Sequence, residues 1–352
     1  MYIAIAIIAF GILIAIHELG HFTAAKLLKV RVFEFAIGMG PKLLTKQGKE
    51  TLYALRALPF GGFCAMGEDD GDTDDPRAFT SQKRWRRVVI LAAGGFANLL
   101  AGFIATVILV SGISGLAGTT IMELIDGFPN EGEQGLMVGD TIVSINGERL
   151  YYIDDFSFLM QINTSGRVDL GIRRGGEKIM LGRFPLERRE YTIDGEKVMR
   201  YGITFNRIEA TAFEKLKYAC YTTMNYIRLI RLSIAQIISG AAGVRDLAGP
   251  VAIVDTMNTI GRSSRSVGEA LYGIANFTAF IGVNIAFVNL LPIPAMDGGR
   301  ILFVFISWAV EKITRRRPDP KYEGYINMTA LVLLMGFMVF ILINDVARLI
   351  SG

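Results

Sequence analysis

The stretch from Ala15 to Lys26, AIHELGHFTAAK, decides how the rest of this 352-residue chain is interpreted. It holds His17 and His21, the only two histidines in the sequence, with Glu18 beside the first. Side chains four residues apart lie on one face of an α-helix, so both imidazoles can reach the same ion. Zn²⁺ accepts histidine nitrogen, and Glu18 is then available as a general base that activates water. The spacing therefore predicts two ligands of a catalytic zinc site.

The residues around this stretch are apolar enough for a membrane. The sixteen residues before His17 read MYIAIAIIAFGILIAI, and 51% of the chain is hydrophobic. A bilayer core of ~30 Å needs about 20 mostly apolar residues of helix. We predict four spans, at residues 2–28, 88–112, 271–310 and 326–345, the third interrupted by prolines. Ionisable side chains inside an apolar span are costly unless they serve a function.

Clusters of Lys and Arg predict the orientation. They lie just after the first span (Lys26, Lys29 and Arg31), just before the second (KRWRR, 83–87), and between the third and fourth (TRRR, 314–317). Four crossings place all three clusters on one side, which the positive-inside rule predicts to be cytoplasmic. The two chain ends and the stretch between the second and third spans are then expected outside.

The outer stretch at residues 113–210 is predicted to be a folded domain. It contains short β-type runs such as TIVSING, RVDLGIRR, EKIMLGRF and YGITF, separated by glycine-containing turns. GLMVGDTIVSINGERL (135–150) resembles the pattern of PDZ domains, which bind extended peptides by adding a strand to a sheet edge. Another small α/β fold is the alternative.

Residues 211–265 are interpreted as an amphipathic and linker region. Residues 211–240 mix apolar residues with Lys and Arg at helical spacing. Arg228 and Arg231 argue against a crossing. We expect an amphipathic helix on the outer membrane surface, and a helix packed on the inserted domain is the alternative. The second membrane half then covers residues 266–352, and the first covers residues 1–112.

A third metal ligand has to come from elsewhere in the chain. Asp297, in NLLPIPAMDGGR, is the only acidic residue between Glu269 and Glu311. By helix rise, His17 and Asp297 both reach the cytoplasmic half of the membrane. An alternative is that Asp297 only caps the helix that starts after the proline break.

Residues 30–66 are neither helical nor an ordinary loop. Their alternating, glycine-rich pattern predicts a β-hairpin, which is tolerated at membrane depth only where protein or water covers it. The acidic run at residues 68–76 is interpreted as a solvated loop without a catalytic role. Cys64 and Cys220 cannot form a disulfide framework or a cysteine-rich zinc site.

Together these motifs resemble the bacterial site-2 proteases, intramembrane zinc metalloproteases of the peptidase M50 type. The chain is most similar to the PDZ-containing branch that includes the regulator-of-sigma-E protease. HELGH matches the family's HExxH element, and NLLPIPAMDGG matches NxxPxPxLDG with Met296 in place of leucine. AAGGFANLLAG resembles the GPxxN element with Gly95 in place of proline, while GMGP, LPFGGFCAMGED and LAGPVAI resemble further family stretches.

The resemblance implies the fold and the activity. The expected fold is a polytopic α-helical membrane protein with four transmembrane spans, a membrane-associated β-hairpin and one extracytoplasmic PDZ domain. The expected enzyme is a zinc endopeptidase in the bacterial cytoplasmic membrane, with its active site toward the cytoplasmic half. It would cleave transmembrane segments of single-span proteins, such as anti-sigma factors or signal-peptide remnants, in regulated intramembrane proteolysis.

The resemblance also implies roles for individual residues. His17, His21 and Asp297 would bind zinc, and Glu18 would activate water. Residues that would contact substrate are Asn289, Asn98, Gly38 and Gly40, although Gly95 weakens the assignment of Asn98. Asn289 could instead satisfy backbone freed by Pro292. The hairpin edge would pair with an unwound substrate helix, and the PDZ domain would bind a peptide or exclude bulky substrates.

A metal transporter or a metal-binding membrane scaffold is the competing class, because broken spans and midplane ligands also occur in transporters. Glu18 beside His17 and the absence of inverted repeats argue against it. A soluble zinc protease on an anchor does not fit, since HELGH lies inside a span. Nothing in the sequence indicates a nucleic-acid partner.

Overall fold

The computed structural model describes residues 2–66, 75–163, 165–193, 196–240, 243, 249–316 and 320–351. Most of the acidic run at residues 68–76, and the start of LAGPVAI, lie outside these residues. The chain divides into two compact units, one formed by residues 1–109 with 226–352 and the other by residues 110–225.

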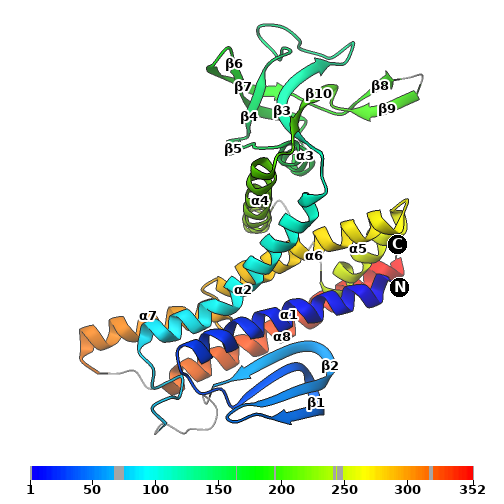
Figure 1. Ribbon diagram of the computed structural model, residues 1–352. Helices are drawn as coiled ribbons and strands as arrows, with labels where there is room; N and C mark the ends of the chain where they lie inside the picture. The colour runs from blue at the N-terminus through cyan, green and yellow to red at the C-terminus, as the bar shows by residue number, and fades with distance from the viewer. Residues whose placement is uncertain are drawn as a thin grey trace. The chain divides into compact units, whose positions relative to one another are not determined.

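The first unit contains the long apolar helices (Figure 1). Its elements are α1 (Tyr2–Leu27), β1 (Glu34–Gln47), β2 (Leu52–Ala65), α2 (Arg84–Ser111), α5 (Pro250–Ser263), α6 (Val267–Leu290), α7 (Asp297–Thr314) and α8 (Pro320–Ser351). Among the described residues, four helices are long and apolar enough to cross a membrane: α1, α2, α6 and α8. This agrees with the four predicted spans and with a multi-pass membrane protein.

The proline break in the third span is confirmed. Helix α6 ends at Leu290, residues 291–296 are irregular, and α7 begins at Asp297. Pro292 and Pro294 have no backbone N–H to continue the helix. The break thus allows a new helix, α7, to begin, and Asp297 is its first residue.

Small residues let α1, α2 and α6 approach closely. A Cβ added to Gly20 of α1 would lie 2.4 Å from the carbonyl oxygen of Ala93 in α2. A Cβ on Gly102 of α2 would lie 2.7 Å from Val283 Cγ2 in α6. Small residues at helix contacts are the usual way for apolar helices to pack in lipid, where the hydrophobic effect does not drive them together. This packing brings the HELGH turn against α2.

Strands β1 and β2 form the predicted hairpin, but each strand is bent and pairs twice. Residues 42–47 pair antiparallel with 52–56, as in a simple hairpin, and the Gly48 N–H donates to the Thr51 carbonyl at the turn. Residues 34–37 pair with 52–55 in parallel register and with 62–65 in antiparallel register. Residues 62–65 therefore form an outer segment of the small sheet.

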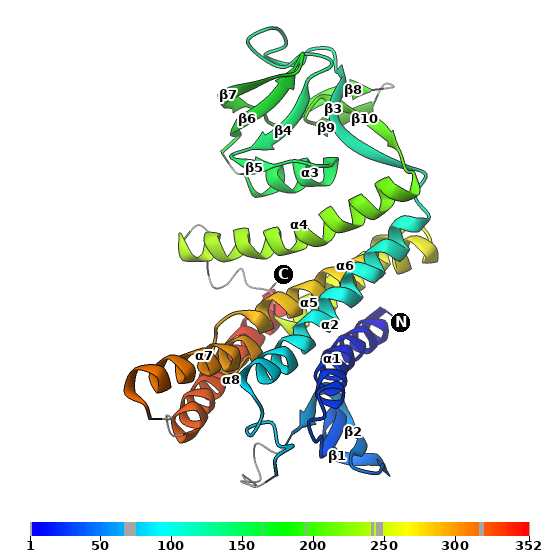
Figure 2. The same cartoon turned by 60° about the vertical axis from the view of Figure 1, so that its left-hand side comes forward.

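The second unit is a small α/β domain (Figure 2). Its main sheet has the strand order β10-β3-β4-β6-β7, with β5 paired to β4. The elements are β3 (Gly115–Leu124), β4 (Thr141–Ile145), β5 (Glu148–Arg149), α3 (Ile153–Ile162), β6 (Arg167–Arg174), β7 (Glu177–Pro185), β8 (Arg189–Ile193), β9 (Glu196–Arg200) and β10 (Ile203–Glu209). All four predicted β-type runs are strands. Helix α4 (Ala212–Ile238) begins in this unit and ends in the first.

The Gly-Asp turn of this domain is held by a buried ion pair. Asp140, 1% exposed, accepts hydrogen bonds from the Met137 N–H and from two nitrogens of Arg174. Arg174 also donates to the carbonyl oxygens of Glu133 and Gly135. The hydrogen bond to Asp140 raises the pKa of Arg174 further above its ordinary value. A single guanidinium thus ties the turn to β6.

Candidate metal centre

Three ligand atoms converge where α1 meets the start of α7. His17 Nε2 lies 3.2 Å from Asp297 Oδ2, His21 Nε2 lies 3.3 Å from the same oxygen, and the two Nε2 atoms are 3.2 Å apart. His21 is buried, and the side chain of Asp297 is only 15% exposed. The structure thus brings together the two residues of one helical turn and a residue 276 positions beyond His21.

These distances fit one zinc ion. A tetrahedral ion with ligand bonds of about 2.0–2.1 Å places its ligand atoms about 3.3 Å apart. All three separations lie within 0.1 Å of that value. Two imidazoles and one carboxylate also match the three-ligand set of catalytic zinc sites, in which a fourth position stays open. Among the described residues, the three or more His, Cys, Asp or Glu side chains that lie close enough together to hold one metal ion are this group, His17, His21 and Asp297.

Hydrogen bonding orients one of the ligands. The Nδ1 atom of His21 lies 2.8 Å from the carbonyl oxygen of Ile90 in α2. Since a carbonyl oxygen only accepts, Nδ1 carries the proton and Nε2 keeps its lone pair for the metal. Asp297 Oδ2 has no hydrogen-bond donor among the described residues. The lone pair of His21 Nε2 and the Asp297 carboxylate oxygen thus face each other at 3.3 Å, an arrangement that a bound cation would stabilise.

Gly94 makes room for the imidazoles. A Cβ at this position would lie 2.3 Å from His21 Nε2 and 2.8 Å from His17 Cε1. Such separations are far shorter than an ordinary contact, so any side chain here would displace the rings. The absence of a side chain at residue 94 is therefore a condition for the geometry described above.

Asp297 is not simply a helix cap. It is the first residue of α7, and the N-cap position belongs to Met296, whose side chain makes no capping hydrogen bond. The carboxylate instead faces the two histidines. Gly298 and Gly299 pack their backbones against the carbonyl oxygens of the preceding loop, where a Cβ would come within 2.2 Å of Leu291 O and 2.1 Å of Ile293 O.

Glu18 lies between the histidines and the small sheet. Its carboxylate is close enough to interact electrostatically with His17, His21 and Asp297. Its Cγ would touch a Cβ added to Gly62 at 2.9 Å, so the outer segment of β2 passes directly beside it. This places the acidic side chain between the metal ligands and a strand edge.

The residues proposed to contact substrate fall in different environments. Asn289 is half-buried, one residue before the end of α6. Asn98 is fully buried in α2, and neither amide atom has a hydrogen-bond partner among the described residues. Gly38 and Gly40 have φ of +87° and +84° and form the bend of β1, where Gly38 packs against the Leu58 carbonyl.

Sequence reasoning missed three groups around the ligands. They are the Ile90 carbonyl, Gly94 and Asn327, whose Oδ1 accepts a hydrogen bond of 3.1 Å from the Ala295 N–H in the loop before Asp297. Gly94 carries a signal that could have been used, because it belongs to a Gly-Gly pair inside an apolar helix. A backbone carbonyl carries no sequence signal.

Comparisons with known proteins agree with this geometry. The model of peptidase family M50 matches residues 5–337 of the chain. A protein of Clostridium acetobutylicum, named as a candidate zinc metalloprotease, is 38% identical over 346 residues, which cover 98% of this chain and 97% of the relative. A similarly named protein of Clostridium perfringens is 33% identical and covers 98% of both chains. The regulator of sigma-W protease RasP of Bacillus subtilis is 26% identical and covers 97% of both.

Proposed function

This chain belongs to peptidase family M50 and is a zinc metalloprotease, and from that premise we propose that it hydrolyses peptide bonds inside the membrane. The observation that carries this proposal is the convergence of His17 and His21, inside the apolar helix α1, with Asp297, the first residue of α7, at 3.2–3.3 Å. Ionisable residues in such segments are rare without a function.

The residues around the site have distinct roles in this proposal. Zn²⁺, when bound, supplies Lewis-acid polarisation and allows water to act as a nucleophile at neutral pH. Glu18 takes a proton from the attacking water and delivers it to the leaving amine. His21, fixed by the Ile90 carbonyl, keeps its ring orientation through the reaction. Asn289, at the end of α6, donates to the substrate backbone or to the developing oxyanion.

The small sheet is proposed to hold the substrate in an extended form. Peptide bonds in a transmembrane helix are hidden in internal hydrogen bonds, so the helix must unwind before cleavage. Residues 62–65 form the outer segment of the sheet, and Gly62 lies beside Glu18. A substrate strand added there would replace its lost helical hydrogen bonds within reach of the general base.

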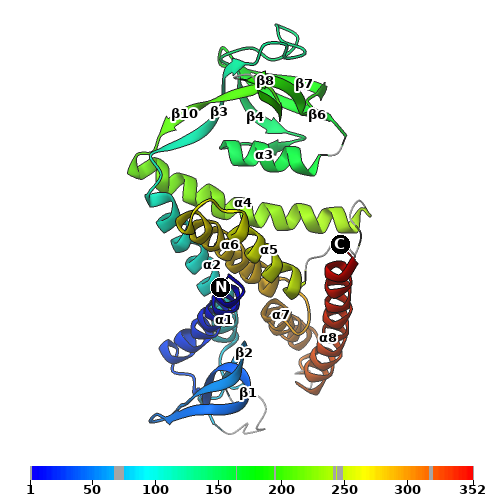
Figure 3. The same ribbon diagram turned by 90° about the vertical axis from the view of Figure 1, so that its right-hand side faces the viewer.

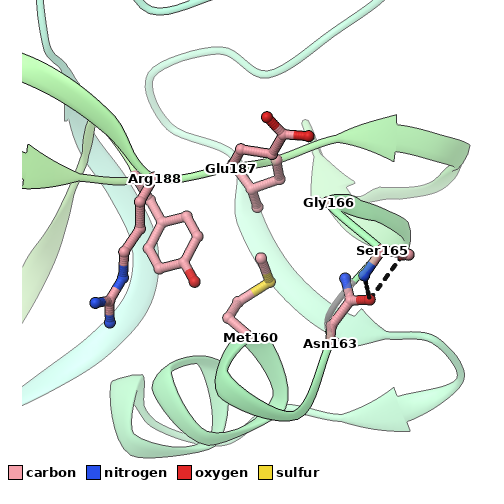
Figure 4. Close-up of a pocket in the computed structure, with 8 residues that line it drawn as sticks. Met160, Asn163, Ser165, Gly166, Glu187 and Arg188 are labelled. Atoms are coloured by element: carbon pink, nitrogen blue, oxygen red, sulfur yellow. Dashed lines mark hydrogen bonds between the residues drawn. The ribbon is translucent and has the colours of Figure 1, made fainter.

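The second unit is proposed to be a PDZ domain that binds an extended peptide. Strand β10 is an edge strand of the main sheet. Phe156 of α3 packs on Phe205 of this strand, with the ring centroids 5.2 Å apart. Beside them lies a cavity of about 270 Å³, lined by Met160 at the end of α3 and by Arg188 and Tyr201 (Figure 4). A sheet edge next to a pocket fits recognition by strand addition.

The substrates and location are proposed from the relatives. The RasP relative is named as a regulator of sigma-W. We propose single-span membrane proteins, of the anti-sigma-factor or signal-peptide-remnant type, as substrates in regulated intramembrane proteolysis. The chain would then lie in the bacterial cytoplasmic membrane with the second unit outside and the metal site toward the cytoplasm, as the Lys and Arg clusters indicate.

The test uses purified full-length protein in proteoliposomes with a single-span substrate. Glu18→Gln should abolish cleavage while the protein retains one zinc, because the amide cannot accept the proton but does not touch the ligands. Cleavage by Glu18→Gln at the unmodified rate would refute the assigned mechanism. The competing transporter function predicts a flux of zinc into the vesicles, and Glu18→Gln should not change that flux. The same proteoliposomes can be used to measure it.

A further inference from the structure

We infer that Asn327 of α8 is a positioning residue for the metal ligand Asp297, although it does not touch the metal site. Its Oδ1 accepts a hydrogen bond of 3.1 Å from the backbone N–H of Ala295, two residues before Asp297. The inference rests on the proposed role of Asp297 as a zinc ligand.

The loop that leads to Asp297 has an unfavourable backbone at one residue. Ala295 has φ of +71°, in the left-handed region that a residue with a Cβ rarely adopts. Within the described part of the chain, the other backbone hydrogen bonds of this loop are local, such as Ile293 N–H to the Leu291 carbonyl at 2.7 Å and Met296 N–H to the Ile293 carbonyl at 3.2 Å. Among the described residues, the bond to Asn327 is the one from this loop's backbone that reaches a distant element, and it holds the strained residue in place.

Helix α8 gives Asn327 little other reason to be polar. The helix lies along one side of the first unit (Figure 3). None of its most apolar 18-residue window is buried. Asn327 is itself half-buried, near the start of this apolar helix. A polar amide in such a helix is unfavourable in lipid unless it is hydrogen-bonded to another element. The bond to Ala295 provides that partner.

The consequence concerns the carboxylate. Two peptide units separate Ala295 from Asp297, and Gly298 and Gly299 pack tightly against the same loop. If Ala295 relaxes to negative φ, the start of α7 has to rotate, and Asp297 Oδ2 moves away from the two Nε2 atoms. Zinc–ligand distances in proteins are expected within about 0.2 Å of their standard values. Asn327 therefore stabilises the metal-binding form of the loop.

The experiment measures zinc affinity by chelator competition on full-length protein, together with kcat and KM for a single-span substrate. Asn327→Leu removes the acceptor at similar volume, while Asn327→Asp keeps an acceptor oxygen. Thr329→Val is the matched control, because its hydroxyl donates to the Tyr325 carbonyl within α8. Each Asn327 variant is also made in an Ala295→Gly background, where positive φ is no longer unfavourable.

We expect Asn327→Leu to weaken zinc binding about 10-fold and to lower kcat with KM changed less than about 2-fold, as for other residues that orient metal ligands. Asn327→Asp should restore most of the affinity, and Thr329→Val should match the unmodified protein. In the Ala295→Gly background the effect of Asn327→Leu should shrink to less than about 3-fold.

Two results would overturn the inference. One is unchanged zinc affinity in Asn327→Leu. The other is an equal loss in both Ala295 backgrounds, which would indicate a general loss of packing by α8. A different result would refute the proposed function itself: an unmodified protein that binds no zinc, or zinc binding that Asp297→Ala leaves unchanged. Failure of the Asn327 inference and failure of the proposed function are therefore distinguishable.

Discussion

Gly94→Ala is a one-methyl change that should disable the metal centre. The new Cβ would lie 2.3 Å from His21 Nε2, 2.6 Å from His21 Cε1 and 2.8 Å from His17 Cε1. An ordinary contact needs at least 3.4 Å, so the His21 ring or α2 has to move by about 1.1 Å. That displacement is about five times the roughly 0.2 Å range within which zinc–ligand distances are expected to lie.

We expect zinc affinity to fall about 100-fold or more, at the upper end of the effects seen when ligand orientation is disturbed. The fold itself should not weaken for reasons of helix propensity, because alanine is favoured over glycine within a helix by about 1 kcal/mol. Zinc affinity is measured by chelator competition and zinc content by mass spectrometry, on protein in nanodiscs.

Gly336→Ala is the matched control. Gly336 lies within α8, and a Cβ there would meet nothing within 4 Å. It makes the same chemical change in an apolar helix without touching a ligand, so zinc affinity should be unchanged. One zinc bound by Gly94→Ala with the affinity of the unmodified protein would refute the packing argument.

Three further predictions follow from the same structure. Arg174→Ala leaves Asp140 buried without its partner and should destabilise the second unit by about 3 kcal/mol, seen as faster hydrogen exchange in β4; unchanged exchange would contradict this. Although burial raises the pKa of Glu34, hydrogen bonds from Arg56 and Lys42 hold the folded-state pKa below the ordinary 4.5. The ionised Glu34 should therefore stabilise the β1–β2 sheet above pH 4.5, and this stabilisation should be lost as the pH falls through the lower folded-state pKa. Glu34→Gln should remove the resulting pH dependence of hydrogen exchange in the sheet. A chelator of Zn²⁺ should abolish cleavage and added zinc should restore it; full activity in metal-free protein would contradict the mechanism.

The local parts of the site were predictable from the sequence. His17, Glu18 and His21 lie within one helical turn, and their chemistry follows from helix geometry alone. Asp297 was predictable because it is an isolated acid in an apolar run broken by prolines. The long apolar segments likewise predicted the helices, since length and composition decide a span without any knowledge of packing.

The rest depends on contacts between distant segments. The hydrogen bond from His21 to the Ile90 carbonyl and the bond from Ala295 to Asn327 join residues 69 and 32 positions apart. Neither has a pattern in the sequence, because one partner in each is a backbone group. The double pairing of residues 34–37 could not be predicted either, since alternation indicates a strand but not its partners.

The most direct test of the central claim is X-ray absorption spectroscopy at the zinc edge, combined with metal content, for the unmodified protein and for Asp297→Ala. We predict one zinc per chain with two imidazole nitrogens and carboxylate oxygen at about 2.0–2.1 Å, and loss of the metal or of its oxygen ligand in Asp297→Ala. An unmodified protein without zinc, or a zinc shell that Asp297→Ala leaves unchanged, would contradict the proposed centre.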